Sequence, residues 1–178
     1  RSKTFWLIDP LDGAKEFLKI PGTVIIDFAE GSINTKEARY LIKEVMQQAL
    51  NFVIEKPENL EKLTNDQTKL RQILFNMLSN AAKFTKNGTV TLSIINYGEK
   101  VRFAVSDTGI GMNAEQLGKV FEEFTQAESS TSKDYGGTGL GLPISKKMTE
   151  LMGGIMEVES EENKGTTFSI TIPIVVEE

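Results

Sequence analysis

The spacing of apolar residues changes at Gly88, and this change limits the possible folds more than any other feature of the sequence. Before Gly88, apolar residues recur every three or four positions, at Leu70, Ile73, Leu74, Met77, Leu78 and Ala81. This spacing predicts a helix that Asn65 or Asp66 caps and that ends near residues 86–88. After Gly88, polar and apolar residues alternate over 89–94 and 101–105, which predicts an antiparallel hairpin around residues 96–99.

The flanking segments extend this pattern to the rest of the chain. The further elements that we expect are helices over 35–50 and about 140–152 and strands over 51–55, 155–160 and 166–173. The last two strands are joined by a turn at 163–165. The expected fold class is α/β: a two-layer α/β sandwich with a mixed, mostly antiparallel sheet and its helices on one face.

Composition excludes several kinds of chemistry. The chain has 178 residues, with 20 Lys and Arg against 25 Asp and Glu, no Cys and no His. Without Cys or His, a Ser-His or Cys-His mechanism and a disulfide framework are excluded. The net charge of −5 and the scattered basic residues argue against nucleic-acid binding, and no apolar run reaches the ~18 residues of a membrane helix. We expect a cytoplasmic domain with no membrane segment.

Three polar side chains share one face of the helix that precedes Gly88. Asn76, Asn80 and Lys83 are spaced by four and three residues, which places them within about 60° of one another. An Asn carbonyl oxygen can bind magnesium, and a Lys ammonium can bind phosphate. An ordinary solvated helix face explains the same pattern.

Two glycine-rich segments lie where a strand ends and where the last helix begins. In residues 107–112 (DTGIGM), the carboxylate can accept a hydrogen bond from an exocyclic amine, and the glycines let a flat ring approach. A simple Asp-Thr-Gly turn is the alternative. In residues 136–141 (GGTGLG), backbone N–H groups before a helix can bind phosphate. This second segment matches neither a Walker loop nor the Gly-x-Gly-x-x-Gly dinucleotide motif.

Five segments in this order and spacing resemble the catalytic ATP-binding domain of sensor histidine kinases. They are LRQILFNMLSNAAKFT (70–85), DTGIGM (107–112), FEEFTQAESS (121–130), GGTGLGL (136–142) and NKGTTFSITIP (163–173), which are similar to the N, G1, F, G2 and G3 boxes of that family. The resemblance implies a GHKL-type ATPase domain with a Bergerat-type sandwich over residues 35–178. It also implies magnesium and ATP or ADP as ligands, and as partners a histidine-bearing dimerisation domain and a response regulator.

The resemblance assigns roles to single residues, none of them a catalytic group. The implied nucleotide-binding residues before and after the lid are Asn76, Asn80, Lys83, Phe84, Asp107, Gly109, Gly111 and Phe168. By the resemblance, Asn80 ligates the magnesium that bridges the phosphates, and Lys83 contacts phosphate. Asp107 accepts the adenine amine, the two glycines admit the base, and Phe168 packs against it.

Residues 113–138 are similar to the ATP lid of that family. The implied nucleotide-binding residues in the lid and just after it are Thr125, Gln126, Lys133, Gly137, Thr138, Gly139, Leu140, Gly141 and Leu142. Lys133 stands where Arg is more usual, and lysine offers a point charge rather than a planar fork. Phe121 and Phe124 either anchor the lid or serve as core aromatics.

Residues 5–18 (FWLIDPLDGAKEFL) resemble a different family, the inositol-monophosphatase and bisphosphate-nucleotidase group. Its Asp-Pro-Leu-Asp-Gly-Thr motif implies Asp9 and Asp12 as metal ligands, but Ala14 replaces the motif's Thr. We therefore expect residues 1–34 to be an atypical N-terminal segment: a fusion or chimera junction, a recombined gene, or a chance turn. A candidate edge strand lies near residues 23–28.

Together these patterns predict the ATP- and magnesium-binding catalytic domain of a histidine kinase in a two-component system. Such a domain is a transferase that passes the γ-phosphate to a histidine elsewhere, since this chain has none. The alternative is a catalytically silent, regulatory or engineered nucleotide-binding module on the same fold. A phosphatase that uses Asp9 is a third class of function.

Overall fold

The computed structural model describes residues 3–5, 51–55, 57, 63–122 and 140–175. The predicted helix over 35–50, the candidate strand near 23–28 and the Asp9–Asp12 motif lie outside the described residues. Residues 123–138 of the predicted lid, and Gly139 after it, also lie outside them.

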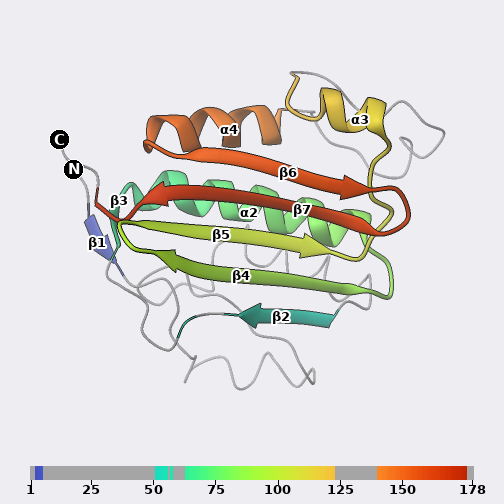
Figure 1. The fold of residues 1–178 in the computed structure, drawn as a ribbon, viewed down its shortest axis with the longest axis horizontal. Helices are drawn as coiled ribbons and strands as arrows, with labels where there is room; N and C mark the ends of the chain where they lie inside the picture. Colours follow the sequence, from blue (N-terminus) through green and yellow to red (C-terminus); the bar gives the residue numbers. More distant parts are fainter. Residues whose placement is uncertain (1–2, 6–50, 56, 58–62, 123–139, 176–178) are drawn as a thin grey trace.

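A five-stranded sheet forms one layer of the fold (Figure 1). In spatial order its strands are β2 (Asn51–Glu55), β4 (Thr89–Tyr97), β5 (Lys100–Asp107), β7 (Gly165–Pro173) and β6 (Ile155–Glu161). β2 pairs in parallel with β4, and every other neighbouring pair is antiparallel. The mixed, mostly antiparallel sheet is thus confirmed. The short strands β1 (Lys3–Phe5) and β3 (Leu63–Asn65), which the sequence did not predict, pair with each other in a separate sheet.

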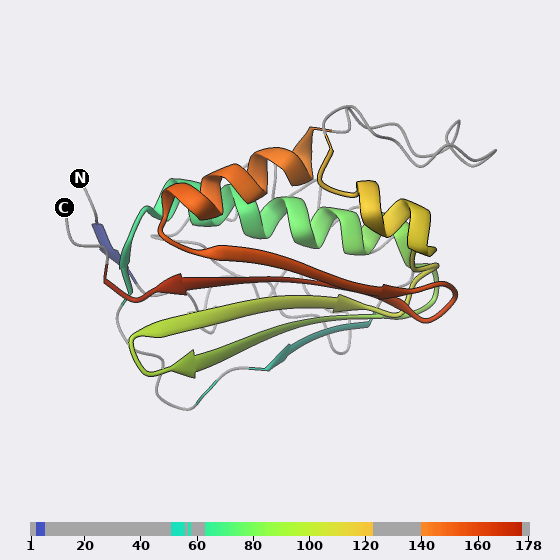
Figure 2. The same cartoon turned by 45° about the horizontal axis from the view of Figure 1, so that its top comes forward.

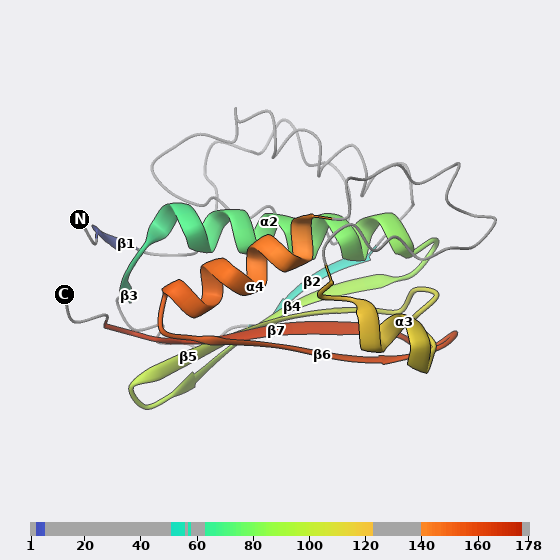
Figure 3. The ribbon, with the colours of Figure 1, turned by 90° about the horizontal axis from the view of Figure 1, so that it is seen from above.

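The helices α2 (Gln67–Phe84) and α4 (Gly141–Leu151) cover the same face of the sheet (Figures 2 and 3). Asp66 caps α2, because its side chain accepts a hydrogen bond from the Lys69 N–H at 3.0 Å. A short helix, α3 (Ala114–Lys119), lies near the end of the sheet at which β5 finishes, on the side of the other helices. No helix in the described part of the chain is long and apolar enough to cross a membrane.

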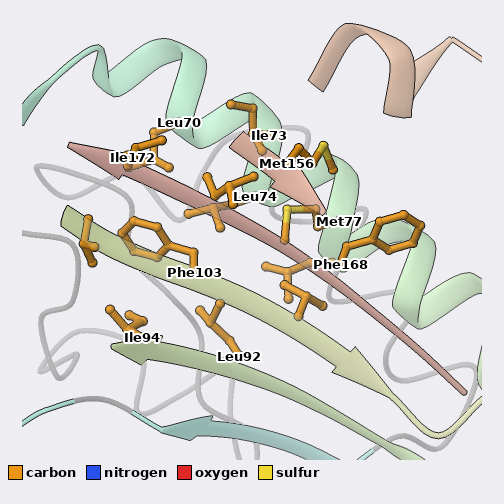
Figure 4. Close-up of a cluster of buried hydrophobic side chains, with 14 of the residues drawn as sticks. Leu70, Ile73, Leu74, Met77, Leu92, Ile94, Phe103, Met156, Phe168 and Ile172 are labelled. Carbon is orange, nitrogen blue, oxygen red and sulfur yellow. The ribbon is translucent and has the colours of Figure 1, made fainter. Parts of the chain in front are cut away.

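The inner face of α2 packs on the alternating residues of the central strands (Figure 4). Residues of this core that are at most 1% exposed include Ile73, Leu74, Met77, Leu92, Phe103, Ile170 and Ile172. Burial of each such side chain contributes about 1.5–3 kcal/mol. This core fixes α2 against β5 and β7, so the polar face of α2 is turned away from the sheet.

The β4–β5 hairpin is longer than the alternation alone predicts. Pairing continues to Tyr97 and Lys100, so the loop is the two residues Gly98 and Glu99 instead of the four from 96 to 99. Gly98 has φ +63°. A type II′ turn requires this left-handed conformation at its first central position, which explains why the loop can be so tight.

Candidate functional site

The predicted site residues that the structure describes gather mainly at one end of the sheet (Figure 1). Asp107 is the last residue of β5, and Gly141 is the first residue of α4. Asn76, Asn80 and Lys83 lie in the second half of α2, which ends beside Asp107. The end of β5 therefore meets the end of α2, and the start of α4 meets the same helix about two turns earlier, at Asn76.

Asn76 connects α2 to the start of α4. Its Nδ2 donates to the Gly141 carbonyl oxygen at 3.1 Å and to Ser145 Oγ at 2.9 Å. Because a carbonyl oxygen can only accept, the amide nitrogen is the atom that faces α4. Its Oδ1 accepts from Gln72 Nε2 at 3.1 Å. Asn76 thus holds two helices together, which the sequence did not predict.

Asn80 lies one turn further along the same face and is half-buried. Within the described residues its side-chain amide makes no hydrogen bond, so its carbonyl oxygen is available to a cation. Lys83 lies beside it, with Nζ 5.1 Å from the centroid of the Phe84 ring. Phe84 itself is 38% exposed at the end of the helix. The two asparagines of this face therefore differ in what they contact.

Asp107 is the acidic group of the site and is largely withdrawn from solvent. Burial raises the pKa of the Asp107 carboxyl above its usual range. Hydrogen bonds from the Gly109 N–H, the Thr85 hydroxyl and the Thr166 backbone act in the opposite direction and compensate only in part. The Gly109 N–H reaches Oδ1 at 2.8 Å. The carboxylate keeps acceptor capacity for a further donor, such as the amine of a base.

The backbone after Asp107 packs tightly against the end of α2. The Ile110 N–H donates to the Phe84 carbonyl oxygen at 3.2 Å. A Cβ at Gly109 would lie only 2.3 Å from that same oxygen, so a side chain has no room there. Gly109 is therefore required by this close approach.

Gly111 meets the turn between β6 and β7 in a similar way. It has φ +62°, and a Cβ there would lie 2.0 Å from the Glu161 carbonyl oxygen. The Asn163 N–H donates to the Ile110 carbonyl oxygen at 2.7 Å and fixes the turn against the loop. The DTGIGM segment is thus held from both sides.

Phe168 is a core residue of β7, only 6% exposed (Figure 4). Its ring meets the Phe121 ring edge to face, with centroids 6.5 Å apart. The Lys146 Nζ lies 5.0 Å from the centroid of the Phe121 ring. Phe121 therefore packs on the core at the start of the lid, while the packing of Phe168 against a base stays a prediction.

The start of α4 carries the last of the predicted residues. Leu140 precedes the helix, Gly141 begins it, and Leu142 packs against the hydrophobic core. The other predicted lid residues lie outside the described residues: Phe124, Thr125, Gln126, Lys133, Gly137, Thr138 and Gly139.

Sequence reasoning missed three features of this site. The helix α3 has a capping box between Asn113 and Gln116, a signal that the sequence does carry. Ser145 and Thr85 are both fully buried beside predicted site residues. Ser145 stands four residues after Gly141 and donates to its carbonyl oxygen at 2.9 Å, but nothing in the sequence distinguishes it from other helical serines.

Residues 65–176 match the family of histidine kinase-, DNA gyrase B-, and HSP90-like ATPases, which is well over half of the chain. The chain belongs to this ATPase family. Two solved structures of histidine kinases share the fold. The catalytic domain of ThkA has a TM-score of 0.65 and 27% identity, covering 79% of this chain and 89% of that one. Full-length ShkA in complex with AMPPNP has a TM-score of 0.67 and 32% identity, covering 78% and 28%.

Similar proteins within this ATPase family include sensor kinases. The chain is 35% identical over 167 residues to the circadian input-output histidine kinase CikA of Synechococcus elongatus, which covers 93% of this chain and 22% of CikA. It is 41% identical over 140 residues to the aerobic respiration control sensor protein ArcB of Escherichia coli, which covers 76% and 18%. The chain thus spans about a fifth of the length of these relatives.

Proposed function

We propose that this chain is the ATP- and magnesium-binding catalytic domain of a sensor histidine kinase, which donates the γ-phosphate to a histidine on a separate dimerisation domain. The observation that carries the proposal is the position of the polar face of α2, which has the Asp107 loop at its end and the start of α4 beside Asn76. The family membership and the kinase names of the relatives support it. Its further partner would be a response regulator, and it would be located in the cytoplasm.

The base would bind at the end of β5. Asp107 would accept the hydrogen bond of the adenine amine, and the close-packed Gly109 and Gly111 would form the floor beside it. A guanine presents a carbonyl oxygen at the same ring position, which an ionised carboxylate repels. Asp107 would therefore select adenine over guanine.

The phosphates would bind between α2 and α4. Asn80 is the amide that suits magnesium, since the amide nitrogen of Asn76 is bonded to α4 and its oxygen accepts from Gln72. The described residues hold no cluster of three or more acidic, His or Cys side chains, so most ligands of the ion would be phosphate oxygens and water. When bound, magnesium neutralises phosphate charge. Lys83 and the N-terminal end of α4 add positive potential on the protein side.

The lid residues would close over the phosphates in this proposal. Thr125, Gln126 and Lys133 would contact the nucleotide from within the lid, as would the glycine segment that leads into Gly141. Phosphoryl transfer needs little covalent chemistry from the protein, because positioning and charge neutralisation supply most of the catalysis. A histidine on another domain would then complete the reaction.

Calorimetric titration with ADP and magnesium tests the nucleotide site. We expect the wild type to bind and Asp107→Asn to bind at least about tenfold more weakly. Asn80→Ala should also lose affinity, and this loss should become smaller when magnesium is chelated. Glu159→Gln, an acid-to-amide change on an exposed residue of β6, is the matched control and should bind normally. No binding by the wild type, or normal binding by Asp107→Asn, would contradict the assignment.

Transfer in trans separates a competent kinase domain from a silent module on the same fold. The chain is mixed with a histidine-bearing hairpin from a related kinase and radiolabelled ATP. Label on the hairpin that disappears in Asp107→Asn supports the kinase. ADP binding without any transfer supports the silent module instead. Release of inorganic phosphate that is lost in Asp9→Ala would support the phosphatase.

A further inference from the structure

Thr85 carries a buried hydroxyl that makes no well-formed hydrogen bond. It is the first residue after α2, it is 0% exposed, and among the described residues its Oγ1 is one of two buried side-chain polar atoms left unpaired. Buried polar groups in native proteins are nearly always paired, so an exception requires an explanation. A valine of the same shape would avoid the penalty at no loss of packing.

The unpaired hydroxyl lies beside the carboxylate of the base site. Thr85 Oγ1 is 2.7 Å and Asp107 Oδ1 is 2.8 Å from the point that a Cβ of Gly109 would occupy. The glycine therefore lets the hydroxyl and the carboxylate approach one another. Thr85 is closed off from solvent, so it acts on a ligand only through Asp107.

We propose that Thr85 is a positioning residue for the base site: its hydroxyl donates to Asp107 and holds that carboxylate in place as an ionised acceptor for the amine of the base. This inference rests on the proposed nucleotide site. In the free protein the hydroxyl already lowers the pKa of Asp107, although the two groups fall short of a well-formed hydrogen bond. When a base bonds to Asp107, a small rotation of the carboxylate brings it onto Thr85.

The electrostatics of Asp107 agree with this role. Burial raises the pKa of Asp107, and the Thr85 hydroxyl is one of the groups that lower it. The charged side chains of the packed segments are those of Lys83 in α2, of Lys86 just after it, and of Glu161, Glu162 and Lys164 at the β6–β7 turn, where Glu161 and Lys164 pair at 2.6 Å. None of these five is among the groups that shift the pKa of Asp107. Its ionisation is therefore set by burial and hydrogen bonds.

The test compares Thr85→Val and Thr85→Ser with the control Thr167→Val. The Thr167 hydroxyl forms a hydrogen bond with Ser106 on β5 and not with Asp107. Two quantities are measured: ADP affinity from about pH 7.5 to about pH 4.5, and the pKa of the Asp107 carboxyl in the free protein by carbon NMR. For Thr85→Val we expect unimpaired folding and an ADP affinity about two- to twelvefold lower. We also expect a higher Asp107 pKa, so that the loss of ADP binding on acidification begins at a higher pH. Thr85→Ser should restore wild-type values, and Thr167→Val should keep them.

An unchanged Asp107 pKa in Thr85→Val would overturn the inference, as would a loss of affinity without any shift of the pH profile. Failure of the wild type to bind ADP would instead remove the proposed function. In that case a raised pKa in Thr85→Val still establishes the contact with Asp107, and an unchanged one refutes it.

Discussion

Replacing Gly111 by alanine tests whether the site is built on a close approach of backbones. Gly111 and Gly98 have nearly the same φ, +62° and +63°, so alanine introduces the same conformational strain at both. Their surroundings differ. A Cβ at Gly98 meets nothing within 4 Å, whereas one at Gly111 lies 2.0 Å from the Glu161 carbonyl oxygen. Gly98→Ala is therefore the matched control for the conformational cost alone.

The difference between the two variants follows from the geometry. Alanine in a left-handed conformation costs about 1–2 kcal/mol. At Gly111, ordinary contact begins only at 3.4 Å, so the loop and the β6–β7 turn must separate by more than an ångström. The hydrogen bonds that join them are Asn163 N–H to Ile110 O at 2.7 Å and Met112 N–H to Ser160 Oγ at 2.8 Å. At about 1 kcal/mol each, their loss brings the total for Gly111→Ala to about 3–4 kcal/mol.

Urea unfolding followed by circular dichroism measures both costs, and calorimetry with ADP and magnesium measures binding. We expect Gly98→Ala to lower the free energy of unfolding by about 1–2 kcal/mol and to bind normally. Gly111→Ala should lose about twice as much stability or more and bind ADP at least tenfold more weakly, about 1.4 kcal/mol. Equal losses of stability in the two variants would refute the argument from close approach.

Three further predictions concern single side chains. Asp107→Asn should be as stable as the wild type or more stable at neutral pH. Burial raises the pKa of the folded Asp107 carboxyl, so the stability of the wild type falls as pH rises through that pKa. The urea midpoints of the wild type and the variant, measured against pH, should diverge in that range. Asp66→Ala should cost about 1 kcal/mol by removing the cap of α2. Burial raises the pKa of Asp66, but its hydrogen bonds and ion pair with Lys69 lower it by more, so the cost should vanish as acid titrates the folded wild type. Ser145→Ala should speed amide exchange in the first turn of α4, measured by mass spectrometry, because it removes the shared contact with Asn76.

Elements with a long, regular apolar pattern were predictable from the sequence. The α2 stripe and the β4–β5 alternation were confirmed because their own residues supply the core that holds them. The three-residue strands β1 and β3 were missed because each forms only by pairing with a segment more than 50 residues away. No local pattern of that length can predict such a partner.

The candidate site was predictable as a set of residues but not as a division of roles. The spacing placed Asn76 and Asn80 on one face of α2. Only the packing of α4 against α2 makes Asn76 a link between the helices and leaves the Asn80 amide available. The same holds for Thr85, which in the sequence is only the residue after a helix. Its proposed role depends on its proximity to Asp107, which the β4–β5 hairpin places beside the end of α2.

The two halves of the site differ in how firmly the backbone fixes them. Around Asp107, backbone atoms approach too closely to admit a Cβ at Gly109, Gly111 and Gly165, the last of which lies against the Asp107 carbonyl oxygen. The start of α4, by contrast, is joined to α2 through the side-chain amide of Asn76. Side chains added at these glycines must therefore disturb folding together with the proposed base recognition. Changes at the Asn76–Ser145 contact can alter the placement of α4 while the sheet and its core stay intact. We therefore expect the proposed phosphate half to be where affinity can be tuned separately from stability.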